Sequence, residues 1–303
     1  MGGCGEVSST CGFQAAGKYG AFGGLGLDFS YSIAVAEELG NIDCAAIPMA
    51  VCVQTHMATP ALAMFGSDSL RAEFLTPSVN GDMVACIAVS EPEAGSDVAG
   101  SAWRLLVKAD WACVLVNTNN NSSPHRSKSL VCVRLDEPGI LRTANVKKLG
   151  MQSSDTAEIF FDNVRVPARN IIGEEGQGFV YQMLQFQDER LVTAAVCKWT
   201  DFGHALSAVL SRLHGDDVTL LASMAKLKAG RLARIVNATQ HPSIDTSAFA
   251  KENEKQFWGG TGFTWDNPVC QMHRDLRLHS IGAGADEVML SIICKYMGIA
   301  PQK

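Results

Sequence analysis

A short run of charged side chains inside a helical stretch could supply a general base. Residues 187–191 are Gln-Asp-Glu-Arg-Leu, and Leu184, Phe186 and Val192 flank the charges. A charged triplet on a helix is usually a solvated face, but these apolar flanks indicate that at least one of the charges points near the core. A desolvated carboxyl group has a raised pKa, which suits proton abstraction near neutral pH.

A loop of small and polar residues offers a place where a ligand could approach the backbone. The apolar run from Met83 to Val89 predicts a buried strand. The turn after it contains Ser90, Gly95 and Ser96, so hydroxyls and backbone N–H groups lie side by side along bare backbone. By these residues alone, a plain surface turn is the alternative interpretation.

Two glycine-rich segments follow near the C-terminus. Residues 256–263 are Gln-Phe-Trp-Gly-Gly-Thr-Gly-Phe, and residues 281–288 are Ile-Gly-Ala-Gly-Ala-Asp-Glu-Val. Each could place backbone groups close to a ligand. The alternative is a simple helix C-cap, which favours glycine for its left-handed conformation.

The pattern along the chain predicts an α+β fold in the order helix, sheet, helix. The predicted helices are 30–39, 45–65, 67–74, 179–204, 217–237, 247–258 and 283–298, and the β-rich runs are 84–89, 112–116, 130–133 and 159–166. The corresponding domains are a poorly ordered leader (1–27), a shortened N-terminal helical domain (28–82), a middle β domain (83–172) and a C-terminal helical domain (173–303).

Composition excludes several functional classes. The formal net charge of −6 argues against a general nucleic-acid binder, and no apolar run is long enough to span a bilayer. Ten cysteines are scattered singly, without a Cys-x-x-Cys pair or a metal-like Cys/His spacing. We therefore expect reduced, mostly buried thiols and no metal site.

Taken together, these motifs resemble the acyl-CoA dehydrogenases. The run Ala88–Gly100 is similar to their flavin-contacting loop at every position that the family constrains. The segment from Lys148-Leu149-Gly150-Met151 to Pro167, followed by the glycine turn 173–179, is similar to the end of their β domain. The two glycine-rich segments, with Arg274-Asp275 between them, are similar to their C-terminal helical region. The resemblance covers about residues 20–300, in blocks, and implies an acyl-CoA dehydrogenase-like fold.

The resemblance also implies which residue removes a proton from the substrate. Many members carry the catalytic glutamate at the position matched here by Ala283, which cannot accept a proton. The isovaleryl and long-chain branches carry it on the long helix just before Arg-Leu, and Glu189 matches that position. Asp188 and Glu287 remain as alternatives.

The remaining site residues are carried over from the family in the same way. The resemblance implies FAD as cofactor and an acyl-CoA as substrate. Flavin contacts would come from Val89, Ser90, Gly95, Ser96, Gln256, Phe257, Trp258, Gly259, Gly260, Ala285, Asp286 and Glu287. Substrate contacts would come from Ser96, Gln187, Asp188, Arg190, Ala283 and Gly284. Chain-length preference would be set by the helices at 30–65 and 179–204 together.

The implied function is oxidation of the α,β C–C bond of an acyl-CoA to a 2-enoyl-CoA, a step of fatty acid β-oxidation, with electrons passed to an electron-transfer flavoprotein. The family further implies a homo-oligomer, as a tetramer, in the mitochondrial matrix. The first residues show no Arg-rich leader, which leaves the cytoplasm as an alternative. An acyl-CoA oxidase-like enzyme that passes electrons to oxygen is a further alternative.

Internal segments of the family pattern are missing from this chain. Neither Trp103 nor Trp111 is followed two residues later by the hydroxyl residue that the family places against the flavin ring. The segment with an Arg and a Gln that contact the flavin pyrophosphate is also missing, between His204 and Lys228. These gaps favour a second hypothesis, a catalytically inactive relative that keeps the fold as a binding or assembly subunit. The retained Glu189 opposes it.

Overall fold

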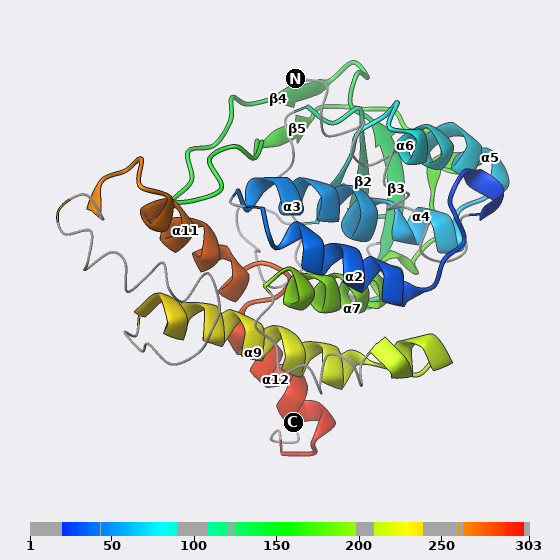
Figure 1. Cartoon of the computed structure of the whole chain (residues 1–303). Coiled ribbons are helices and arrows are strands. Elements are labelled where there is room, and N and C mark those ends of the chain that lie inside the picture. Colours follow the sequence, from blue (N-terminus) through cyan, green and yellow to red (C-terminus); the bar gives the residue numbers. More distant parts are fainter. Residues whose placement is uncertain are drawn as a thin grey trace. The chain divides into compact units, whose positions relative to one another are not determined.

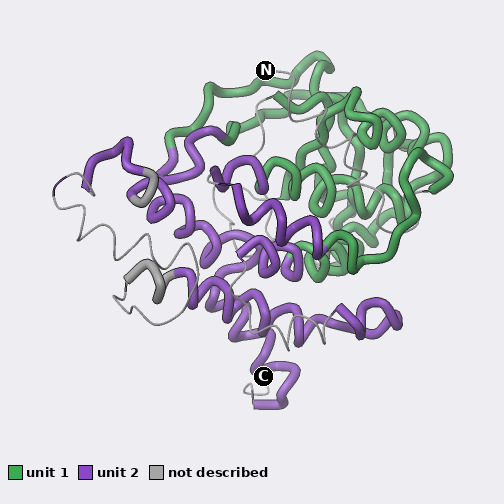
Figure 2. Tube along the Cα trace, in the orientation of Figure 1, with its two compact units in different colours: residues 1–32, 49–147, 154–189 green, residues 33–48, 148–153, 190–303 purple. Residues whose placement is uncertain are grey.

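The computed structural model describes residues 20–42, 44–89, 108–119, 123, 125–197, 209–238, 260 and 263–299 (Figure 1). Contacts within the chain gather into two compact units, coloured separately in Figure 2. Unit 1 comprises residues 1–32, 49–147 and 154–189, and unit 2 comprises residues 33–48, 148–153 and 190–303. The described elements follow the order helix, sheet, helix, and the predicted α+β class is confirmed.

The first predicted helix is present as α2 (Phe29–Leu39), after a short 3₁₀ turn, η2 (Gly20–Phe22). The Asp28 side chain begins α2, because its Oδ1 accepts a hydrogen bond of 2.9 Å from the Ser30 N–H. Gly40 follows the last helical residue, as the sequence predicts for a helix stop.

The helix predicted over 45–65 is instead broken into three elements. These are α3 (Ala46–Cys52), the π-helix η3 (Val53–Ala58) and α4 (Pro60–Phe65). Pro60 has no N–H to continue the preceding turn and is favoured at the start of a new helix. The Thr59 hydroxyl donates to the Gln54 carbonyl at 2.8 Å and so occupies one of the acceptors left by the break.

The predicted cap at Ser67 is confirmed. Its Oγ accepts from the Leu70 N–H at 3.3 Å and begins α5 (Asp68–Leu70). The helical path continues beyond the predicted end at Phe74, through the π-helix η4 (Arg71–Leu75) and α6 (Thr76–Asn80). It ends at Gly81, whose φ of 85° is a left-handed conformation suited to glycine.

Three of the predicted strands form one sheet in the order β1-β2-β3. β1 is parallel to β2, with Ala85 opposite Trp111, and β2 is antiparallel to β3, with Cys113 opposite Cys132. A separate antiparallel pair joins β4 to β5, with Leu141 opposite Phe160. The strand bounds are β1 Ala85–Ala88, β2 Trp111–Asn117, β3 Lys128–Arg134, β4 Ile140–Arg142 and β5 Ile159–Phe161.

Both strands of the β4-β5 pair differ from the prediction. β4 was not predicted, because three residues give no alternating pattern to detect. The strand expected over 159–166 ends at Phe161, since Asn163 adopts a left-handed φ of 52° and breaks the extended backbone.

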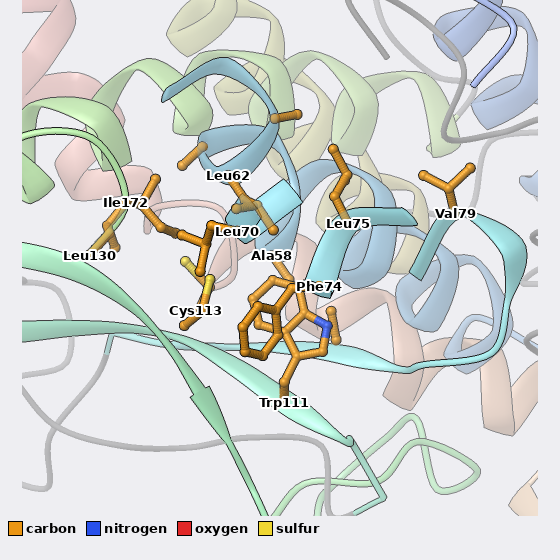
Figure 3. Close-up of a cluster of buried hydrophobic side chains, with 14 of the residues drawn as sticks. Ala58, Leu62, Leu70, Phe74, Leu75, Val79, Trp111, Cys113, Leu130 and Ile172 are labelled. Atoms are coloured by element: carbon orange, nitrogen blue, oxygen red, sulfur yellow. The ribbon is translucent and has the colours of Figure 1, made fainter. Parts of the chain in front are cut away.

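The core of unit 1 is formed where the helices of residues 58–79 pack on one face of the β1-β2-β3 sheet (Figure 3). Trp111 lies fully buried at its centre, with its ring 5.3 Å from that of Phe74. The indole N–H donates to the Ser78 hydroxyl at 2.9 Å. The polar atom of the largest core side chain is therefore satisfied, as a buried indole requires.

The long helix α7 (Gly178–Val196) begins as predicted. A 3₁₀ turn, η5 (Ala168–Asn170), precedes it. The predicted end of this helix lies among residues 198–208, which are outside the described chain. Unit 2 contains α9 (Thr219–Ala238) and α12 (Asp286–Tyr296), which pack together. It also contains α11 (Pro268–Leu276) and a 3₁₀ turn, η7 (Arg277–Ser280). Helix α11 was not predicted, although its apolar and polar residues follow a clear helical period. The helix predicted over 247–258 lies outside the described residues.

Within the described part of the chain, no helix has the length and apolarity to cross a membrane, and no cluster of His, Cys, Asp and Glu could hold a metal ion. The cysteines described are free thiols, and most of them are buried: Cys52, Cys86, Cys113, Cys132 and Cys197.

Candidate functional site

Helix α7 carries the predicted charged triplet into the protein interior. The exposed fractions of Asp188, Glu189 and Arg190 are only 9%, 6% and 5%, and Gln187 is half-buried. The expectation that at least one charge lies near the core is therefore exceeded, because all three are buried. Charged side chains are seldom buried without partners, and each of these three has further interactions in the structure.

Four buried residues follow one face of α7 at helical spacing: Gly178, Gln182, Gln185 and Glu189, here called the α7 stripe. Gly178 begins the stripe against β3, where a Cβ atom would overlap the backbone of Ser129 and Leu130. Only glycine permits this approach, so the first turn of α7 is fixed against the sheet.

Gln185 fixes the middle of the α7 stripe to the broken helix of residues 53–65. Its amide oxygen accepts from the Ala61 N–H at 3.1 Å, and its amide nitrogen donates to the Met57 carbonyl. One turn earlier, the Tyr181 ring stacks on that of Phe65, with 3.9 Å between the ring centroids. The glutamine thus satisfies backbone groups that the π-helix leaves without partners.

Gln54 joins the π-helix η3 to the start of β1. Its amide oxygen accepts from the Ala85 N–H at 2.6 Å, and its nitrogen donates to the carbonyls of Ser78 and Met83 at 3.2 and 3.1 Å. β1 leads directly to Val89, which packs against the core of unit 1. The strand that precedes the predicted flavin loop is therefore anchored to η3.

A thiol and an imidazole, those of Cys52 and of His56 in η3, are buried where the charges of Glu189 and Asp188 act on them. Burial, and to a smaller extent the charge of Glu189, raises the pKa of the Cys52 thiol to about 12. Burial lowers the pKa of His56 to about 4, although the charge of Asp188 opposes this shift. The Thr55 hydroxyl lies 2.6 Å from Nδ1 of His56. The thiol and the imidazole are therefore both neutral at pH 7.

The buried histidines should make the protein less stable in acid. In the unfolded chain His56 takes up a proton below its ordinary pKa of 6.5, whereas the folded protein resists protonation until about pH 4. Stability therefore falls as the pH drops from 6.5 toward 4, by about 2 kcal/mol per such histidine between pH 7 and pH 5. His279 in unit 2 has the same lowered pKa, caused by burial and then by the Lys226 charge.

Urea unfolding at pH 7 and pH 5 would measure this loss. In His56→Gln the loss on acidification should be smaller by about 2 kcal/mol than in the unsubstituted protein. Replacement of the exposed His125, whose ring contacts Phe179, serves as the control and should leave the pH dependence in place. An unchanged pH dependence in His56→Gln would contradict the buried, neutral state of this imidazole.

Gln182 differs from the other glutamines of α7 in having no hydrogen-bond partner. Its side chain is fully buried, and neither amide atom is hydrogen-bonded in the structure. A buried polar group left in this state costs about 1–3 kcal/mol. Gln182 and Gln185 were not predicted as site residues, although their spacing of three and four residues from one another and from Glu189 places them on one helix face.

The second glycine-rich segment forms a left-handed turn in unit 2, before α12. Ala283 and Gly284 have φ values of 55° and 97° and are half-buried. The left-handed φ at Gly284 favours glycine, because an L side chain is strained in this conformation. The fully buried Lys226 donates from Nζ to the Gly284 carbonyl and holds the turn against α9.

The turn around Gly150 and the Arg274-Asp275 pair, both singled out in the sequence, are in contact within unit 2. A Cβ on Gly150 would overlap the carbonyl of Arg274, and the Met151 N–H donates to the Asp275 side chain. The Arg274 guanidinium lies 3.8 Å from the centre of the Trp265 ring and donates to the Trp265 carbonyl at 3.0 Å. The turn around Gly150 is therefore seated on the end of α11.

Three of the predicted flavin contacts, Ala285, Asp286 and Glu287, lie at the N-terminus of α12. Ala285 is the N-cap of α12 and its side chain offers no acceptor, so the first N–H groups of the helix lack a side-chain cap. Asp286 follows in the first turn but is buried, with an exposed fraction of 3%, so Glu287 is the exposed carboxylate of this turn. A carboxylate accepts from hydroxyl groups but repels a diphosphate. Gly260 is exposed, with open space where a Cβ would stand.

The other predicted contacts lie outside the described residues. These are Ser90, Gly95, Ser96, Gln256, Phe257, Trp258 and Gly259. Among the predicted site residues that the structure describes, Gln187, Asp188 and Glu189 belong to unit 1. Ala283, Gly284 and Ala285–Glu287 belong to unit 2.

Two acyl-CoA dehydrogenase family models match this chain, one near each end. The family model for the acyl-CoA dehydrogenase N-terminal domain matches residues 10–82, and that for the C-terminal domain matches residues 250–298. The chain is 27% identical to the short-chain specific acyl-CoA dehydrogenase, mitochondrial, of Rattus norvegicus, over 90% of this chain and 77% of that protein. It is 26% identical to the long-chain specific acyl-CoA dehydrogenase, mitochondrial, of the same species, over 96% of this chain and 80% of that protein.

The long-chain alignment spans 346 residues, more than the 303 of this chain, so that relative contains segments that the chain lacks. Solved structures have the same fold. An acyl-CoA dehydrogenase from Geobacillus kaustophilus matches with a TM-score of 0.78 at 24% identity, over 97% of this chain and 90% of that one. Butyryl-CoA dehydrogenase from Megasphaera elsdenii matches with a TM-score of 0.81 at 22% identity, over 97% and 89%.

Proposed function

Since the chain belongs to the acyl-CoA dehydrogenase family of FAD-dependent oxidoreductases, we propose that it oxidises the α,β C–C bond of an acyl-CoA to a 2-enoyl-CoA. The observation that carries this proposal is the position of Glu189 at the interior end of the α7 stripe, with an exposed fraction of 6%. A carboxylate held in this way is suited to remove the weakly acidic proton next to a thioester.

Glu189 is the proposed base, and the residues around it prepare it for that task. It accepts the α-proton of the acyl group, and its buried position excludes water that would compete for the proton. Gly178 and Gln185 fix the depth and rotation of α7, so the carboxylate is held in one orientation. FAD, when bound, supplies the acceptor for the hydride that leaves the β-carbon.

Other residues bind and orient the substrate in this proposal. Ala283 and Gly284 lie against the thioester, where backbone N–H groups of the left-handed turn can polarise its carbonyl. Lys226 keeps this turn in place through the Gly284 carbonyl. Gln187, Asp188, Arg190 and Ser96 complete the proposed contacts to the acyl-CoA.

The cofactor contacts are proposed at the residues matched by the family. Val89, Ser90, Gly95 and Ser96 contact the flavin after β1, and Gln256–Gly260 and Ala285–Glu287 contact its other end. We further propose that an electron-transfer flavoprotein receives the electrons in fatty acid β-oxidation, and that the protein is a homo-oligomer. Two relatives named above are mitochondrial enzymes, which supports the mitochondrial matrix as the location.

The visible absorption spectrum of the purified protein tests the proposal. A flavin spectrum that bleaches when an acyl-CoA is added without oxygen is the expected result, because two electrons pass from the substrate to the cofactor. A folded protein without flavin would contradict it and favour the inactive, fold-retaining relative. Peroxide formed in air would instead indicate an acyl-CoA oxidase-like enzyme.

A further inference from the structure

We propose that Lys226 is a positioning residue of the reaction, whose buried positive charge acts through the Gly284–Ala285 peptide group and strengthens the backbone donors offered to the thioester carbonyl. This inference rests on the proposed function, because it takes the thioester to lie against the turn of residues 281–285. It assigns to Lys226 an electrostatic role, in addition to the attachment of this turn to α9.

The first observation is a basic side chain with no exposed surface. Lys226 has an exposed fraction of 0%, and its Nζ donates to the Gly284 carbonyl. Its charge also lowers the pKa of the buried His279, after the larger effect of burial. Water screens an enclosed charge less than a surface charge, so the field of this ammonium reaches the groups beside it.

The turn is attached to one face of α9 at both ends. The Ser280 hydroxyl donates to the Gly230 carbonyl at 3.0 Å. Lys226, one helical turn before Gly230, donates to the Gly284 carbonyl. A Cβ on Gly230 would lie only 2.8 Å from the His279 carbonyl oxygen, so a larger residue there would displace the chain. The ammonium is therefore held in a fixed position relative to the turn.

The turn also has backbone donors that the described residues do not use. Among the residues that the structure describes, none accepts a hydrogen bond from the N–H groups of Ala283, Gly284 or Ala285. These three residues are half-buried, and the preceding Ile281 is 52% exposed, so their backbone is not closed off within the chain. Backbone N–H groups polarise a carbonyl oxygen on which negative charge develops.

One peptide group joins the ammonium to these donors. The Gly284 carbonyl, which accepts from Lys226, and the Ala285 N–H belong to the same peptide unit. A charge at the oxygen end withdraws electron density from the nitrogen, so the N–H becomes a stronger donor. The buried acidic side chain of Asp286 lies near the same face of α9, with Oδ1 3.2 Å from where a Cβ on Gly230 would stand, and opposes part of this field.

The carbonyl stretching band of a bound thioester tests the inference without turnover. The probe is 2-octenoyl-CoA with an isotope label at the thioester carbonyl, bound to the holoprotein and measured by infrared difference spectroscopy. We expect the band at a lower frequency than in solution, and Lys226→Met should make that shift smaller. Lys226→Arg keeps the charge and should restore the shift. Lys228→Met makes the same change at an exposed lysine of α9 and should leave the band in place.

Reaction rates separate this role from a merely structural one. In Lys226→Met the kcat for flavin reduction by octanoyl-CoA should fall about tenfold with KM nearly unaltered, because the lost effect grows as charge develops on the carbonyl. If that variant does not fold, Lys226→Gln, which keeps a neutral donor, replaces it with the same expectations.

Three outcomes would overturn the inference. These are an unaltered band and rate in a folded Lys226→Met protein, a raised KM with an unaltered band, and failure of the unsubstituted protein to bind 2-octenoyl-CoA. A band shift that depends on Lys226, found in a protein whose flavin is not reduced by an acyl-CoA, would contradict the proposed function but not the role of Lys226.

Discussion

Glu189→Gln should slow flavin reduction by an acyl-CoA by about 10²–10⁴-fold while leaving the fold and the bound flavin intact. Glutamine matches the shape of glutamate but cannot accept the proton, and positioned bases contribute rate factors of this size. Anaerobic stopped-flow measurement of flavin bleaching gives the rate directly. The circular dichroism and flavin content of the variant establish that the chemistry, and not the fold, has changed.

Two carboxylates compete with Glu189 for this role, and the same assay separates them. Asp188 is the preceding residue on α7, and Glu287 lies in the first turn of α12. A larger loss in Asp188→Asn or Glu287→Gln than in Glu189→Gln would transfer the role of base to that residue. Glu175→Gln, at an exposed residue of the turn before α7, is the matched control and should react at the unaltered rate.

Trp111→Ala should destabilise the protein by about 3–5 kcal/mol, the range for aromatic side chains deleted from a core. The indole is fully buried against Phe74, and its loss also removes the hydrogen bond to the Ser78 hydroxyl. A loss of this size is a large part of the stability of an ordinary domain. Urea unfolding followed by circular dichroism measures it.

Trp265→Ala is the control for this prediction, since that side chain is 60% exposed. It loses a contact with the Arg274 guanidinium and little buried surface, so we expect a loss of about 1 kcal/mol or less. Similar losses in the two variants would mean that Trp111 does not stand at the centre of the core.

The sequence predicted elements where local pattern decides structure. The cap at Ser67, the end of α2 at Gly40 and the apolar runs of β2 and β3 all follow from short-range chemistry. The break at residues 53–60 was missed, because it depends on Gln185, which lies more than a hundred residues away in the sequence and satisfies the groups that the break exposes. Pro60 was a local signal for a new helix, but not for the π-helical turn that precedes it.

The candidate site was predictable only where it depends on neighbouring residues in the sequence. Apolar flanks around Asp188 and Glu189 were sufficient to predict that a charge lies inside. The neutral state of His56 and the unpaired amide of Gln182 depend on which groups surround them in the fold. Both are properties of long-range packing, so no inspection of neighbouring residues could reveal them.

The glycine at the start of α7 has a consequence for how the chain tolerates insertions and deletions. With Gly178 fixed against β3, one residue added or removed before Glu189 would turn the carboxylate by about 100° and shift it by about 1.5 Å. Three or four residues would nearly restore its direction but move it by about one helical pitch. The eleven-residue interval from Gly178 to Glu189 therefore sets the phase of the base, and length is as strictly determined there as residue type.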